Sequence, residues 1–269
     1  MSANIYRHEL RTRLKSVVIW SLAIAALVVV YFSFSSVFAD QAALMNQMLA
    51  KFPQELRAAF ALDKMDMSTV LGFYSLVFLF TQLCLAIQAS NYGFGLVSME
   101  ESELTADFLL SKPVSRTQVL TSKLLAALTG LSITNLVVWL SSFAAISLFR
   151  GEREYEPGTL LLLLISIVIF QLSFLSVGLV ISLLVKRVRS VTPYGLGLGF
   201  GTYVLSAFSG VFGEVKLELI TPFKHLDAAD IVQHGAYDTP LVLLNVAVTL
   251  ISLAVSYRLY IRRDIPAVS

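Results

Sequence analysis

Six long stretches without charge dominate this sequence. They cover residues 17–38, 69–91, 124–149, 159–185, 191–212 and 241–257, and no Asp, Glu, Lys, Arg or His lies within them. A helix of about 20 apolar residues crosses the hydrocarbon core of a bilayer. Because lipid offers no hydrogen bonds to the backbone, such stretches must satisfy their own N–H and C=O groups as helices. The predicted fold class is therefore all-α: a polytopic membrane protein with six transmembrane helices, in one domain over residues 1–269.

The composition agrees with a membrane protein. Charged residues make up 14% of the chain and hydrophobic residues 57%, whereas soluble domains carry about 25% charged residues. The net charge of +2 is too small to indicate a nucleic-acid partner. Cys84 is the only cysteine, so no intrachain disulfide can form.

The N-terminal residues 1–15 are basic and amphipathic. Ile5, Leu10 and Leu14 can face lipid while four basic side chains face water, which predicts a helix at the membrane surface. The apolar run that follows is longer than the core of a signal peptide, so we expect it to be retained.

The distribution of basic residues predicts the orientation. If the N-terminus lies inside, thirteen of the twenty Lys and Arg residues fall in inner segments and seven in outer ones. Inner loops are normally the richer in Lys and Arg. Both termini are therefore predicted to be cytoplasmic.

The segment 99–116, reading MEESELTADFLLSKPVSR, is a charged interruption between the second and third spans. Its first half is acidic, and Leu104 and Phe108 share one helical face. On the cytoplasmic side, anionic headgroups would repel this helix. It would then prefer water or a basic groove on another protein, and the sequence leaves both open.

A turn and a second helix follow this acidic helix. Pro113 disfavours helical geometry at Lys112, so the acidic helix is predicted to stop near Ser111. Ser115 and Gln118 have the spacing of a capping box, which predicts a new helix that begins there and enters the membrane.

Glycines and polar residues inside the spans can each be interpreted in two ways, as packing residues or as parts of an interface or pathway. Gly195 with Gly199 and Gly197 with Gly201 form small-xxx-small pairs, which serve helix packing or, alternatively, a dimer interface or a pathway. Amides and hydroxyls in the spans either bond between helices or line a path for an amphipathic substrate.

Several function classes lack their residues. Proton-coupled transport usually needs titratable groups at membrane depth, and the spans have none, although sodium coupling is conceivable. His8, His225 and His234 show no metal-ligand spacing, so no metal site and no catalytic residue is predicted. The chain also has no phosphate-binding loop for ATP.

The acidic motif and the six-span layout together resemble the membrane subunits of ATP-binding-cassette exporters of the ABC-2 type. In EESELTADFLLSKPVSR, the family's pattern is matched by Glu100, Glu101, Glu103, Leu109, Leu110, Ser111, Pro113, Ser115 and Arg116. Two further stretches are similar to that family: ITPFKHLDAADIVQHG at 220–235, before the last span, and the closing YRLYIRRDI.

The resemblance implies a permease driven by a separate ATPase subunit, which would bind ATP and Mg²⁺ itself, and a second permease subunit, identical or related. The motif would be a short cytoplasmic coupling helix between spans 2 and 3. Its docking residues would be Glu100, Glu101, Glu103, Leu104 and Phe108, with Pro113 and Arg116 fixing the turn. The pathway would follow the second and fifth spans and their residues Gln82, Gln88, Thr202, Tyr203 and Ser206.

The expected function is export of an amphipathic drug, an antimicrobial peptide or a lipid-like compound across a bacterial cell membrane. Three alternatives remain at this stage. They are a scaffold or sensor subunit that does not transport, a sodium-coupled transporter, and an intramembrane enzyme acting on lipid.

Overall fold

The structure is a computed structural model that describes residues 2–41, 44, 47–48, 51–53, 57, 64–102, 114–185, 188, 190–209 and 217–262. Within these residues every regular element is a helix. The predicted all-helical fold class is therefore confirmed. Most of the polar segment 40–66 lies outside the described residues.

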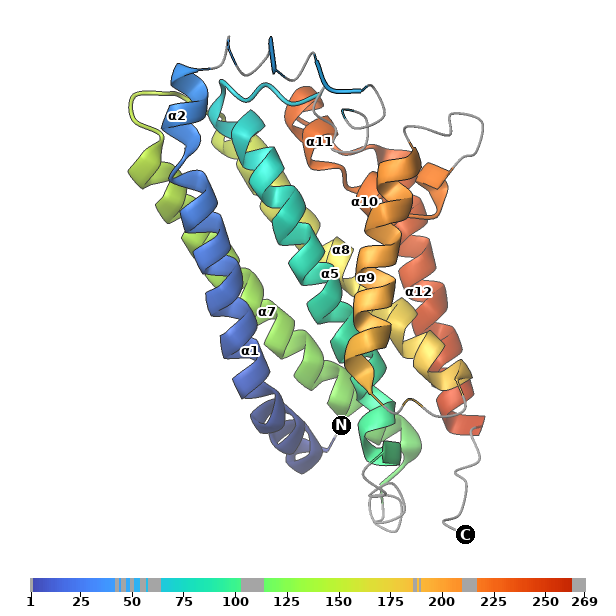
Figure 1. The fold of residues 1–269 in the computed structure, drawn as a ribbon. Helices are drawn as coiled ribbons and strands as arrows, with labels where there is room; N and C mark the ends of the chain where they lie inside the picture. The colour runs from blue at the N-terminus through green and yellow to red at the C-terminus, as the bar shows by residue number, and fades with distance from the viewer. Residues whose placement is uncertain are drawn as a thin grey trace.

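The long helices form an up-and-down bundle (Figure 1). Their bounds, with those of the short helices, are α1 Ala3–Phe32, α2 Ser35–Asp40, α5 Val70–Ser102, α7 Arg116–Phe149, α8 Pro157–Leu184, α9 Val191–Ser209, η1 Leu217–Leu219, α10 Pro222–His225, α11 Ala228–His234 and α12 Thr239–Arg262. We call the end where α5 stops and α7 starts the motif end. The opposite end, which carries α10 and α11, is the cap end. The start of α1 and the end of α12 both lie at the motif end.

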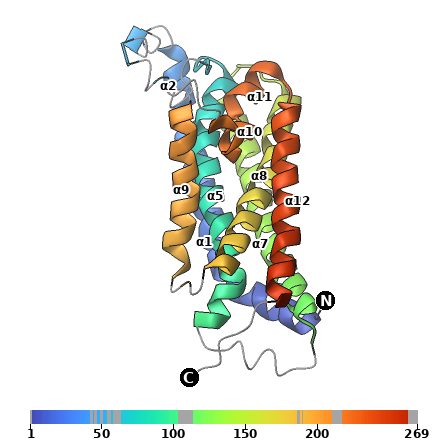
Figure 2. The ribbon, with the colours of Figure 1, turned by 90° about the vertical axis from the view of Figure 1, so that its right-hand side faces the viewer.

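Five helical stretches of the described chain are long and apolar enough to cross a membrane: α1 with α2, α5, α7, α8 and α12. They correspond to five of the six predicted spans. α9 covers the remaining one, at 191–212, and lies alongside α5 (Figure 2). Its glycines and hydroxyl-bearing residues lower its hydropathy, so the sixth span stays a prediction.

The observed helix boundaries differ most from the predicted ones at the motif end. α1 begins at Ala3, so the basic lead-in and the first span form one helix, whose first turns lie across the motif end (Figure 2). α5 continues beyond the predicted limit of its span to Ser102. The first turn of the predicted coupling helix is therefore the last turn of a transmembrane helix.

α5 and α8 form the centre of the bundle. Of the most apolar 18 residues in each helix, 67% are buried in α5 and 61% in α8, against 28% in α1 and 17% in α12. α1 packs with α7 on one side of this pair. On the other side α9 packs on α5, and α12 packs on α8.

Two glycines let α5 and α8 approach closely. A Cβ atom added to Gly93 would overlap the carbonyl oxygen of Leu175, and one added to Gly178 would lie 3.1 Å from the carbonyl oxygen of Ser90. Helices in lipid associate through such van der Waals contact, because lipid tails remove the hydrophobic driving force.

The glycine run of α9 divides into two faces. Gly195 and Gly199 lie against Asn91 and Ile87 of α5, where a Cβ atom on either glycine would collide with the side chain. Among the described residues, a Cβ atom on Gly197 or Gly201 would meet nothing within 4 Å. Gly195 and Gly199 thus lie at the contact with α5, and the role of the two predicted pairs stays a prediction.

The cap consists of α10 and α11, which are anchored on the central pair. The side-chain amide of Gln82 donates to the backbone oxygen of Leu226 at 2.9 Å, and the Tyr237 hydroxyl donates to the backbone oxygen of Leu162 at 2.6 Å. Gly235 ends α11 with a positive φ of 61°, a conformation that suits glycine.

His225 connects the cap to α12. Its Nε2 lies 3.2 Å from the backbone oxygen of Leu219, and its Nδ1 lies 3.3 Å from Nδ2 of Asn245. Burial lowers the pKa of His225, and the hydrogen bonds to backbone oxygens and the charge of Asp238 oppose this only in part. The imidazole is therefore neutral at pH 7.

The Gly93→Ala substitution should destabilise the bundle by about 1–3 kcal/mol, because the new methyl group collides with rigid backbone. Gly197→Ala is the matched control: it adds the same group in open space and removes a helix glycine, which should be neutral or slightly stabilising. Thermal unfolding of the purified chain in detergent measures both. Equal midpoints for the two variants would contradict the proposed contact.

The cap should lose stability as the pH falls below about 6.5. A lowered folded-state pKa means that the unfolded chain binds the proton first, so stability is present above the ordinary pKa of 6.5 and is lost below it. Thermal unfolding midpoints between pH 7.5 and 5.5 should fall less for His225→Gln than for the natural chain. His234→Gln, at an exposed position, should keep the natural pH dependence.

Candidate functional site

The predicted coupling residues lie at and beyond the end of α5. Glu100 and Glu101 belong to its last turn. Glu103, Leu104, Phe108 and Pro113 lie outside the described residues. Arg116 is the first residue of α7.

The predicted capping box at the start of α7 is confirmed. The Ser115 hydroxyl accepts from the Gln118 backbone N–H at 3.2 Å, and the Ser115 N–H donates to the Gln118 side chain at 3.3 Å. Two backbone N–H groups at the helix start are satisfied in this way. The helix that leaves the acidic segment therefore has a fixed beginning.

α12 is tied to the first turns of α7. Arg116 donates from Nη1 to the backbone oxygen of Ile261 at 3.1 Å and, at 3.5 Å, to that of Tyr260. The hydroxyls of Thr121 and Tyr257 lie 2.8 Å apart. Arg116 thus binds carbonyls in the last turn of α12, where a cation also complements the helix dipole.

Lys123 joins α7 to the end of α5. Its ammonium group donates to the backbone oxygen of Leu96 at 2.7 Å and lies 3.5 Å from a carboxylate oxygen of Glu9. Lys123 is only 1% exposed. A buried charge is stable only with such partners, so their removal is costly.

The start of α1 completes this arrangement. Arg13 lies 3.4 Å from the Glu9 carboxylate and 5.2 Å from the ring centre of Tyr92 on α5. We call Glu9, Arg13, Tyr92, Leu96 and Lys123 the motif-end brace. Two further hydrogen bonds run from α1 and the residue before it to α7: Ser2 N to Ser122 Oγ at 2.8 Å, and Tyr6 to Thr129 at 3.0 Å.

Sequence reasoning did not find the motif-end brace. Lys123 entered only the count that set the orientation, and Glu9 was not singled out. The available signal was a lysine directly before an apolar run, facing an acidic residue within a basic segment. Nothing in that pattern specifies that these two residues, 114 positions apart, meet.

Four of the five predicted pathway residues lie near the cap or on α9, whereas the fifth, Gln88, faces α7. Gln82 holds the cap, and the Tyr203 ring packs edge-on against Phe223 of α10, at 5.6 Å between centres. Thr202 and Ser206 lie on the same helix as Tyr203. Gln88 is turned away toward α7, where its amide donates to Thr134 at 2.9 Å. Their role as pathway lining stays a prediction.

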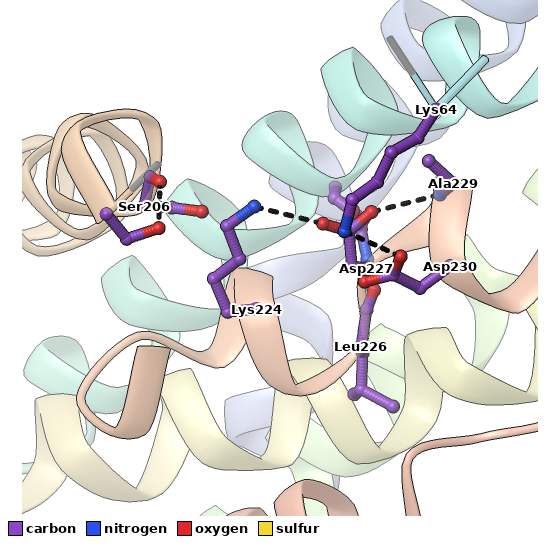
Figure 3. Close-up of polar contacts among 9 residues, drawn as sticks. Lys64, Ser206, Lys224, Leu226, Asp227, Ala229 and Asp230 are labelled. Carbon is purple, nitrogen blue, oxygen red and sulfur yellow. Dashed lines mark hydrogen bonds and ion pairs between the residues drawn. The ribbon is translucent and has the colours of Figure 1, made fainter. Parts of the chain in front are cut away.

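The cap end carries an open polar pocket of about 410 Å³ between α11 and the start of α12. Asp227 accepts from Lys224 at 3.1 Å, and Asp230 accepts from Lys64 at 2.8 Å (Figure 3). Asp227 also caps α11 through the N–H of Ala229. Carboxylates thus outnumber the ammonium groups that pair with them, because Asp238 lines the same pocket.

Comparison with known families identifies the chain. Residues 3–265 match the family model described as "ABC-2 family transporter protein". No curated protein matches the chain. The match covers nearly the whole sequence, and with the apolar helices it makes the chain a multi-pass membrane protein. The chain belongs to the ABC-2 family of transporter proteins, as a membrane component of transport rather than a catalyst.

Proposed function

We propose that the chain is the permease subunit of a bacterial exporter, driven by a separate ATP-binding-cassette ATPase. In this proposal α9 is the fifth of six spans, both termini are cytoplasmic, and the motif end faces the cytoplasm. A second permease subunit would complete the translocation pathway. The substrate class is an amphipathic drug, an antimicrobial peptide or a lipid-like compound.

One observation carries the coupling part of this proposal: both helices that flank the segment 103–113 are tied to other helices at the motif end. α5 and α7 are joined through Lys123 and Leu96, the start of α1 through Glu9, and the end of α12 through Arg116. A force applied to this segment would therefore act on four helices at once: α1, α5, α7 and α12.

The residues of the predicted coupling segment 99–116 suit a groove on the ATPase. Glu100, Glu101 and Glu103 would meet basic residues, and Leu104 with Phe108 would fill an apolar site in the partner. Pro113 and Arg116 would hold the turn into α7. ATP and Mg²⁺ would be bound by the ATPase alone, so this chain would need no cofactor of its own.

The pathway would run beside α5 and α9, along Gln82, Thr202, Tyr203 and Ser206, whereas Gln88, the fifth residue expected to line it, faces α7. Support comes from the face of α9 that carries Gly197 and Gly201, where an added Cβ atom would meet no atom of the described chain within 4 Å. This face could meet a second permease subunit. Gly195 and Gly199 would meanwhile hold α9 on α5.

Copurification tests the docking. Leu104→Asp combined with Phe108→Asp should reduce recovery of the ATPase with the tagged permease at least tenfold, because two buried apolar anchors are lost. The control, Gln233→Asp with Ala236→Asp, adds the same charges at exposed positions of the cap end and should change nothing. Undiminished ATPase recovery with the first variant would refute docking through this segment.

The motif-end brace can be tested by a double-mutant cycle. Glu9→Gln should destabilise the chain by about 1–3 kcal/mol, because the buried Lys123 loses a charged partner. Adding Lys123→Met to that variant should recover part of the loss, since the buried ammonium group that lost its charged partner is then removed as well. Thermal unfolding reports stability, and ATPase activity in the complex reports coupling. Purely additive effects would show that the two charges do not interact.

A further inference from the structure

A crevice of about 80 Å³ lies between α9 and α12, over α8 and α10. Its inner wall includes Ser173 and Phe174 of α8, both almost fully buried. Its rim includes the apolar residues Leu219, Ile220 and Val248, which are 44%, 63% and 37% exposed. A buried floor that contains polar groups, with an exposed apolar rim, suits an amphiphile that inserts head first.

The hydrogen bonds around His225 determine what the floor offers. The backbone oxygen of Leu219 can only accept, so Nε2 of His225 carries the proton. In the neutral ring Nδ1 is then an acceptor, and Asn245 must donate to it from Nδ2. The orientation of the Asn245 amide follows from this chain of partners.

This orientation leaves an unused buried acceptor on a residue that lines the crevice. Asn245 is 1% exposed, and its Oδ1 has no hydrogen-bond partner among the described residues. An unsatisfied buried polar atom costs about 1–3 kcal/mol. Thr202 adds a second acceptor: its hydroxyl donates to the backbone oxygen of Leu198 at 2.7 Å, which leaves oxygen lone pairs free to accept.

The charges nearby favour a cation. Glu218 directly precedes the rim residue Leu219, and the charge of Asp238 acts on His225. The pKa of Lys64 shows the same negative potential. Partial burial lowers this pKa, but the hydrogen bond to Asp230 and the negative charges of Asp230, Asp227 and Glu218 outweigh that effect. The pKa of Lys64 is therefore raised overall.

The crevice lies toward the cap end of α12. Asn245 is roughly 9 Å along the helix axis from Thr239, at 1.5 Å per residue. An amphiphile lying in the cap-end half of the bilayer could therefore reach it from the side.

We propose that this crevice is a lateral binding site for the ammonium head of a cationic amphiphile, with Asn245 Oδ1 and Thr202 Oγ1 as its acceptors and the alkyl chain leaving over Val248. The ammonium group can come from a transported compound or from a bilayer lipid such as phosphatidylethanolamine. A role in transport rests on the proposed function. Binding itself needs neither the ATPase nor transport, so the two proposals can fail separately.

The test uses the full chain in nanodiscs of phosphatidylcholine, a lipid whose head has no N–H donor. Dodecylamine with a diazirine in its chain is the probe, and mass spectrometry locates the labelled residues. We expect label on the η1–α10 segment and on α12 near Val248. Unlabelled dodecylamine should compete at least tenfold better than dodecanoate, whose ionised head only accepts.

Two variants and one control separate binding from folding. Asn245→Leu removes the acceptor, and Val248→Phe fills the rim without touching the His225 pair; each should reduce labelling at least tenfold. Val255→Phe is the control. Val255 lies two turns further along α12 and is 39% exposed, against 37% for Val248, so this variant should be labelled as strongly as the natural chain. Unchanged labelling of Val248→Phe, or equal competition by dodecanoate, would overturn the proposal.

The lipid composition distinguishes the two sources of the ligand. If replacing a third of the phosphatidylcholine by phosphatidylethanolamine suppresses labelling, the site holds a bilayer lipid. If labelling persists, the site selects the small cationic amphiphile. Either result supports the ammonium site.

Discussion

The backbone contact between α5 and α8 is the constraint on which the rest of the bundle depends. In lipid, helices are held by close packing rather than by escape from water. Gly93 and Gly178 supply this packing: a side chain at Gly93 would collide with the backbone of α8, and one at Gly178 would be in tight contact with the backbone of α5. All the other spanning helices lie around this pair, and α9 and α12 would have no common support without it.

α5 also connects the two ends of the molecule. It runs without interruption over 33 residues, which corresponds to about 50 Å. Near the cap end Gln82 holds the turn between α10 and α11, and at the motif end the Leu96 carbonyl receives Lys123. The helix that begins under the cap is thus the one whose last turn carries Glu100 and Glu101.

The features that could be predicted from the sequence are those set by local order. Apolar length located five spans, and the capping-box spacing placed the start of α7. The glycine run shows what spacing cannot predict. Spacing identified two faces, but only the position of α5 decides that Gly195 and Gly199 contact it, while Gly197 and Gly201 face away from the rest of the described chain. Gly93 and Gly178 were missed because neither has a second glycine four residues away; Ala89 and Ser182 give them only the weaker small-xxx-small spacing.

The candidate site was harder to predict for the same physical reason. Lys123 and Glu9, or Gln82 and Leu226, are partners only because helices distant in sequence become neighbours. The free acceptor on Asn245 is still less visible, since it follows from a chain of hydrogen bonds through His225 to Leu219. Composition suggests polar groups in a span, but not which of their atoms remain unpaired.

α12 connects the motif end with the lateral crevice without involving the contact between α5 and α8. Because α5 and α8 interlock, a force on either should move both, which leaves the space between them unchanged. α12 is held differently: Arg116 binds carbonyls in its last turn, and Asn245 lies on the same helix, about 22 Å from Tyr260. A displacement of the start of α7 would therefore tilt or shift α12 against α8. That movement would widen or close the crevice, whose opposite wall on α9 is attached to α5 instead.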